Sequence, residues 1–166
     1  MQTLDRDEVS TVVAADPADV YALVSDITRT PRFSPEVTSA RWLDGATGAA
    51  VGARFEAVNS AGNGRSWRNR PVVTVADPGR EFAFSRTEPF AGTIVWRYRL
   101  EPVQGGTRVT ESYTVERPVS RLGWLVIERC FRGGVRREVL RDGMRTTLQR
   151  MRDTLEADRD EVPEPR

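Results

Sequence analysis

The chain has 166 residues, of which 39% are hydrophobic and 30% are charged, and its formal net charge is +1. This length predicts one domain with a sizeable core. The balanced charge argues against a nucleic-acid partner, which requires a basic face. The sequence has no His and a single Cys, Cys130, which excludes the commonest general base, an internal disulfide and a Cys-rich zinc site. No spacing of Asp and Glu indicates a metal site, and we expect neither a metal nor a cofactor.

The amino-terminal residues MQTLDRDEVS are charged and contain no apolar signal core. No uninterrupted apolar run approaches the ~20 residues that are needed to cross a bilayer. We therefore expect a cytoplasmic protein without a membrane span.

The first elements predicted along the chain are one strand and one or two short helices. EVSTVVAA (8–15) has strand character, and Asp16-Pro17 then supplies an N-cap and a Pro at the first helical position. The apolar residues Val20, Leu23, Val24 and Ile27 follow at helical spacing. The connection TRTPRFSPEV (28–37) is interrupted by Pro and has room for one more helical turn around 32–34.

Six strand-like stretches come next, separated by short turns rich in Gly, Asn, Asp and Pro. They are 37–43, 53–59, 65–76, 80–86, 93–102 and 107–115, and the glycine-rich DGATGAAVG lies between the first two. Consecutive strands joined by such turns are typical of an antiparallel meander.

The last third of the chain changes to a helical period. Apolar residues from 135 to 155 step by three or four, which predicts one long helix with a single buried face: Leu140, Met144, Leu148, Met151 and Leu155. The preceding segment VSRLGWLVIERCF is very apolar; we expect it to pack as core or lid, with a homodimer contact as the alternative. The charged tail 158–166 is expected to be disordered, which leaves residues 1–157 as one domain.

This order of elements predicts an α+β domain in which a curved antiparallel sheet wraps around the C-terminal helix, with two short helices near the N-terminus. Three stretches, 17–35, 62–84 and 95–118, resemble the START-related (SRPBCC) superfamily and, within it, the polyketide cyclase/dehydrase branch. The resemblance covers about residues 9–155. It implies a helix-grip fold with a ligand cavity between sheet and helix, in a superfamily that includes enzymes, lipid carriers and ligand-gated receptors.

Strand alternation identifies the side chains that face this enclosure. They are mostly aromatic with a few polar groups, a composition typical of a site for a small hydrophobic or aromatic molecule. The alternative is that they fill a solid core. The predicted ligand-binding residues are Trp67, Asn69, Phe82, Phe84, Trp96, Tyr98, Leu140 and Met144.

The strand RVTESYTVE places Glu111 on its apolar face, beside Val109 and Tyr113. A Glu is almost never fully buried unless it is paired. Arg86 shares the inward face of its strand with Phe82 and Phe84, and a forked Arg86–Glu111 ion pair is the interpretation that we favour. The alternative is a catalytic group of Glu111, Arg86 and Tyr113, in which burial tunes Glu111 as a general acid or base.

The resemblance bears on which chemistry to expect. In the tetracenomycin-type aromatase/cyclases, an Arg on the fourth strand and a Tyr after the second helix are implicated in guiding ring closure. The aligned positions hold Val73 and either Glu36 or Val37. The resemblance therefore implies a polyketide cyclase-like protein that binds a ligand in its cavity. An enzyme of polyketide or related secondary metabolism, acting as a cyclase, dehydratase or aromatase, is the alternative.

Overall fold

The computed structural model describes residues 5–60, 64–88, 92–120 and 136–160. In chain order the elements are β1 (Arg6–Val13), α1 (Pro17–Ser25), the 3₁₀ helix η1 (Ile27–Arg32), β2 (Val37–Trp42), β3 (Phe55–Ser60), β4 (Ser66–Asn69), β5 (Val72–Asp77), β6 (Glu81–Glu88), β7 (Gly92–Val103), β8 (Gly106–Arg117) and α3 (Arg136–Asp160).

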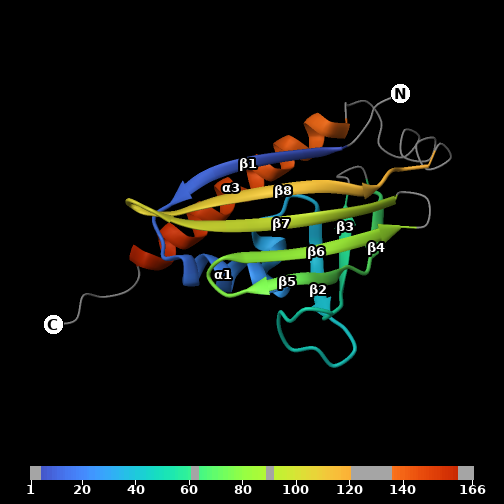
Figure 1. The fold of residues 1–166 in the computed structure, drawn as a ribbon, viewed down its shortest axis with the longest axis horizontal. Helices are drawn as coiled ribbons and strands as arrows, with labels where there is room; N and C mark the ends of the chain where they lie inside the picture. The colour runs from blue at the N-terminus through green and yellow to red at the C-terminus, as the bar shows by residue number, and fades with distance from the viewer. Residues whose placement is uncertain (1–4, 61–63, 89–91, 121–135, 161–166) are drawn as a thin grey trace.

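The strands form two antiparallel sheets. The larger has five strands in the order β1-β8-β7-β6-β5, and the smaller has three in the order β2-β3-β4. Figure 1 shows α3 lying along one face of the large sheet, behind β1, β8 and β7, while β2 and β3 run across the direction of its strands. This arrangement confirms the predicted helix-grip fold, a curved antiparallel sheet with a long C-terminal helix.

The predicted fourth strand, 65–76, is two strands that belong to different sheets. β4 pairs with β3, whereas β5 pairs with β6. The break falls at Arg70-Pro71, because Pro has no backbone N–H to continue a ladder. The Pro71 carbonyl still accepts a hydrogen bond from the N–H of Phe55 at 3.2 Å, so the two sheets meet at this corner.

Two groups of buried side chains hold the helix against the sheet. The larger group contains α1 and the C-terminal half of α3, where Leu148, Met151 and Leu155 are buried as their spacing predicted. In the smaller group, Leu140 and Met144 from the N-terminal half of α3 pack against Ile94 and Tyr113 of the large sheet. Burial of these apolar faces is the main force that positions α3.

An ion pair fastens the same half of α3 to the edge strand. The Asp7 carboxylate on β1 accepts two hydrogen bonds from the Arg141 guanidinium, from Nε at 2.8 Å and from Nη2 at 2.6 Å. The side chain of Asp7 is only 5% exposed. The hydrogen bonds from Arg141 hold the pKa of Asp7 below its usual value, against the opposing effect of burial.

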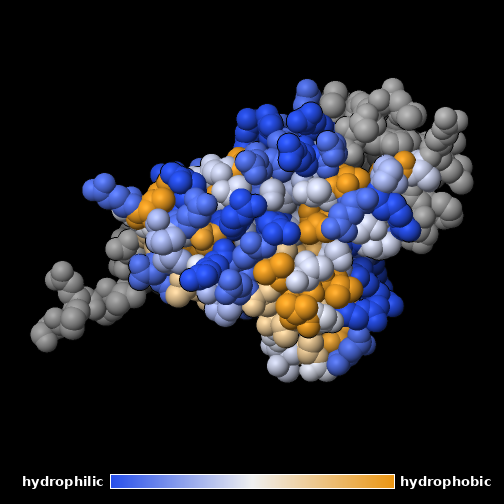
Figure 2. Space-filling model, in the orientation of Figure 1, coloured by the Kyte–Doolittle hydropathy of each residue, from blue (hydrophilic) through white to orange (hydrophobic). Residues whose placement is uncertain are grey.

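The outer face of the large sheet is mostly hydrophilic, as Figure 2 shows. Apolar side chains gather on this view over β5 and the connection between β2 and β3, where Val51 is 70% exposed. Val51 does not line the cavity described below. At Val51 this patch is therefore separate from the interior site.

Two predictions concern the C-terminal tail and the apolar segment 119–132. α3 continues to Asp160, three residues into the predicted tail, and 161–166 lie outside the described residues. The apolar segment 119–132 also lies outside them, apart from Val119 and Ser120. Among the described helices, none is long and apolar enough to cross a membrane.

Candidate functional site

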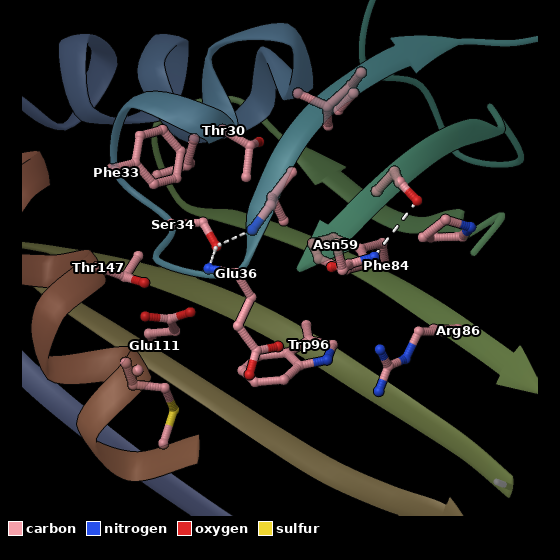
Figure 3. Close-up of a pocket in the computed structure, with 18 of the residues that line it drawn as sticks. Thr30, Phe33, Ser34, Glu36, Asn59, Phe84, Arg86, Trp96, Glu111 and Thr147 are labelled. Atoms are coloured by element: carbon pink, nitrogen blue, oxygen red, sulfur yellow. Dashed lines mark hydrogen bonds between the residues drawn. The ribbon is translucent and has the colours of Figure 1, made fainter. Parts of the chain in front are cut away.

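A cavity of about 110 Å³ lies between the two sheets and α3. Its wall combines aromatic and aliphatic side chains with a smaller number of polar ones, and Figure 3 shows several of them converging from different elements. Pro35 and Val139 lie in the lining and are exposed, so the cavity reaches the surface between the start of β2 and the first turn of α3.

The register of the large sheet explains the floor of this cavity. Phe82, Tyr98 and Glu111 are direct cross-strand partners on β6, β7 and β8. The next inward row runs from Phe84 to Trp96 and on to Tyr113. All but Tyr113 line the cavity, so two adjacent rows of the sheet supply most of its aromatic surface.

Glu111 is buried in the floor, with only 4% of its surface exposed. Its Oε1 accepts a hydrogen bond from the Tyr98 hydroxyl at 3.0 Å, and its Oε2 has no hydrogen-bond partner among the described residues. Burial raises the pKa of Glu111 to about 8, although the Tyr98 hydrogen bond acts in the opposite direction. The carboxyl group is therefore predominantly protonated at neutral pH.

The favoured ion pair between Arg86 and Glu111 is wrong. Arg86 lies opposite Ile94, which lies opposite Val115, four residues along β8 from Glu111. Two strand spacings and four residues of rise separate the two backbones by about 16 Å. Figure 3 shows Trp96 between the two side chains, with the Arg86 guanidinium at the far side of the indole. Sharing an inward face brought both to one cavity but not into contact.

The structure brings most of the predicted site residues to the cavity. The lining includes Asn69, Phe82, Phe84, Arg86, Trp96, Tyr98, Glu111, Leu140 and Met144. Trp67 and Tyr113 are not in it. Trp67 pairs with Asn59 nearer the β3–β4 hairpin and is half-buried. Tyr113 is covered by α3, packed among Leu140, Met144 and the tilted ring of Trp96.

Sequence reasoning missed the wall opposite this floor. It is formed by residues of η1, of the loop into β2, and of β2 and β3: Ile27, Thr30, Phe33, Ser34, Pro35, Glu36, Val37, Ala40, Phe55, Ala57 and Asn59. Alternation along FEAVN would have identified Phe55, Ala57 and Asn59, because all three are buried on one face of β3. No periodic pattern marks the loop around Glu36, and the one signal that pointed there was the resemblance, in which Glu36 or Val37 aligns with a family Tyr.

Two polar side chains on this wall, Ser34 and Asn59, are held in position by hydrogen bonds. The Ser34 hydroxyl accepts hydrogen bonds from the backbone N–H groups of Glu36 and Val37, which fixes the turn that brings Glu36 to the cavity (Figure 3). Asn59 donates from Nδ2 to the Ala57 carbonyl at 3.4 Å. Asn69 is 6% exposed, and its Oδ1 has no hydrogen-bond partner among the described residues.

The polar set does not have the arrangement of a metal centre. Within the described part of the chain, no group of three or more His, Cys, Asp or Glu side chains is placed to hold an ion. The chemistry that these residues themselves offer is a neutral acid, a phenol, amides and a guanidinium around an aromatic surface.

A curved sheet and a long helix enclosing an aromatic cavity define this chain as a helix-grip protein. It belongs to the polyketide cyclase / dehydrase and lipid transport family, whose model matches residues 6–156. The match confirms the resemblance that the sequence showed. A comparison with curated protein sequences found no match.

Solved structures agree with this assignment. The Polyketide_cyc-like protein Cgl2372 from Corynebacterium glutamicum is 30% identical, with 99% of each chain covered and a TM-score of 0.57. The di-domain ARO/CYC StfQ from the steffimycin biosynthetic pathway has a TM-score of 0.72 at 16% identity, covering 95% of this chain and 52% of that one. Protein CV1439 from Chromobacterium violaceum has a TM-score of 0.67 at 15% identity, covering 92% of this chain and 99% of that one. The last two likenesses establish the fold alone.

Proposed function

We propose that the protein binds a small hydrophobic or aromatic molecule in the cavity between its sheets and α3, as a polyketide cyclase-like binding protein. The observation that carries the proposal is the lining itself. The cavity is lined by the aromatic rings of Phe55, Phe82, Phe84 and Trp96. In a solid core these rings would be in close contact with other side chains, with no space of this size left between them. Apolar pockets with a few convergent polar groups are the usual form of a small-molecule site.

The volume limits the size of the part of the ligand that is enclosed. An engineered apolar cavity of roughly 150 Å³ binds benzene, and this cavity measures about 110 Å³. The cavity can therefore enclose at most about one aromatic ring, and the rest of a larger ligand would extend through the opening beside Pro35 and Val139.

Replacing Trp96 should weaken this binding strongly. Trp96 lines the cavity, and Trp42 is also half-buried but does not line it. We expect Trp96→Ala to reduce the affinity for acetophenone at least about tenfold, because aromatic anchors dominate such contacts, and Trp42→Ala to change it much less. A titration followed by NMR measures both. Equal losses in the two variants would place the binding elsewhere.

A second candidate function is catalysis, and it rests on the protonated state of Glu111. A carboxylic acid that faces a cavity near neutral pH can protonate the ketone oxygen that is attacked in ring closure, or the hydroxyl that leaves as water in dehydration. The similarity of the protein's fold to that of the di-domain ARO/CYC StfQ is consistent with this alternative. The enzyme would be a cyclase, dehydratase or aromatase of polyketide or related secondary metabolism.

A turnover assay with a linear poly-β-ketone separates the two functions. If Glu111 is the acid, Glu111→Gln should form cyclised product at least about 100-fold more slowly, with acetophenone affinity unchanged. Product formation at the wild-type rate in that variant would exclude an acid role. A carrier would form cyclised product no faster than the uncatalysed reaction, in the wild type and in the variant alike.

We also propose, from the sequence, a cellular location and a candidate oligomeric contact. We expect the protein to act in the cytoplasm, and we retain a homodimer contact through segment 119–132 as the alternative to lid or core packing. Light scattering on the purified protein measures its mass in solution, and the mass of a monomer would exclude the homodimer contact.

A further inference from the structure

Two polar atoms of the cavity wall are left without a partner among the described residues, and both belong to side chains that are more than nine-tenths buried. They are Oε2 of Glu111, on β8, and Oδ1 of Asn69, on β4. Leaving a buried polar atom unpaired is costly, and native proteins have few such atoms. Here the two occur in the lining of one cavity, in different sheets.

The two atoms need hydrogen-bond partners of opposite kinds, an acceptor for one and a donor for the other. Tyr98 donates to Oε1 of Glu111, so in the neutral acid Oε1 is the carbonyl oxygen and Oε2 carries the proton. Oε2 is therefore a hydrogen-bond donor that needs an acceptor. Oδ1 of Asn69 is an acceptor that needs a donor.

We propose that Glu111 and Asn69 form a two-point recognition site for an uncharged aromatic molecule, with a carbonyl oxygen that accepts from Glu111 and a hydroxyl that donates to Asn69. The inference rests on the proposed binding function and adds the residues that set its specificity. Anionic ligands are disfavoured at Glu111, because a charge buried beside this carboxyl group without a partner of opposite sign costs far more than a neutral polar group that is hydrogen-bonded.

The charged and titratable groups around the cavity are consistent with this assignment. Tyr98 faces Glu111 from β7, Glu36 comes from the loop before β2, and Arg86 lies two rows away on β6. The residues of α3 that line the cavity are uncharged, and Arg141 of this helix is engaged with Asp7. Burial keeps the pKa of Glu111 at about 8, so its acid form persists at neutral pH.

Acetophenone and α-methylstyrene form a matched pair of probes, since they differ only in C=O against C=CH₂. At pH 6.5 we expect the wild type to bind acetophenone at least about tenfold more tightly than α-methylstyrene. Glu111→Gln retains an N–H donor and should keep this preference, whereas Glu111→Leu should lose it. Above pH 9 the preference should fall in the wild type and persist in Glu111→Gln.

Asn69 is tested with 4-hydroxyacetophenone. The added hydroxyl should improve wild-type affinity several-fold over acetophenone, and Asn69→Leu should abolish that gain while it keeps the preference for the ketone. The unfolding midpoint of each variant, measured first, shows that it is folded at the temperature of the titration.

Several results would overturn the inference. They are equal wild-type affinity for acetophenone and α-methylstyrene, an undiminished preference in Glu111→Leu, tighter binding of benzoate than of acetophenone, or no gain from the hydroxyl. In each case the probes still bind and the proposed binding function stands. If no probe binds at the cavity, the binding function itself fails, and this inference fails with it.

Discussion

Glu111→Gln should be more stable than the wild type at pH 9, by on the order of 5 kcal/mol in the free energy of unfolding. In the unfolded chain the carboxyl of Glu111 ionises near its ordinary pKa of about 4.5, whereas in the fold its pKa is about 8. Below pH 4.5 both states carry the proton, and the carboxyl costs nothing. As pH rises from there to 8 the unfolded state alone loses its proton, so the wild type loses stability until the folded state also ionises.

Urea unfolding of both proteins at several values between pH 4 and pH 9 measures this difference. The two curves should coincide near pH 4 and diverge up to pH 8. Glu8→Gln, at an exposed position of β1, is the matched control and should follow the wild type throughout. A constant difference between Glu111→Gln and the wild type would mean that Glu111 ionises normally in the fold.

Asp7→Ala should destabilise the protein by about 2 kcal/mol at pH 7, since it removes two hydrogen bonds between charged groups at a carboxylate that is 5% exposed. The pKa of Asp7 is lowered in the fold. Its contribution is therefore present above the unfolded pKa of about 4 and is lost as pH falls through the lowered folded value. The destabilisation should shrink at acid pH, in the opposite sense to the effect at Glu111.

Urea unfolding at pH 7 and pH 3 tests this expectation. Glu101→Ala is the control, because Glu101 and its partner Arg108 are both about half exposed, and exposed pairs contribute little. A loss at Asp7 no greater than at Glu101 would show that the pair does not fasten α3 to β1.

The parts of the fold that sequence could predict are those set by local pattern. Apolar residues at three- and four-residue steps identified α3, and alternation placed Phe82, Phe84, Trp96 and Tyr98 on the face that lines the cavity. Both patterns depend only on the geometry of one element. Predictions from these patterns therefore require no knowledge of which strands are neighbours.

The parts that sequence could not predict depend on register and on irregular backbone. Arg86 and Glu111 face the same cavity, but the pairing of β6, β7 and β8 separates them. The division of 65–76 between two sheets follows from tertiary pairing at Pro71. Glu36 reaches the cavity from a turn that Ser34 stabilises, and a turn has no period from which its direction could be read.

The most direct test of a ligand site in this cavity is a crystal structure of the protein soaked with 4-hydroxyacetophenone. The expected result is electron density for the ring between Phe84, Trp96 and Met144, with the carbonyl oxygen within hydrogen-bonding distance of Oε2 of Glu111. Density for the probe only on the outer surface, with the cavity closed by its own side chains, would contradict the account.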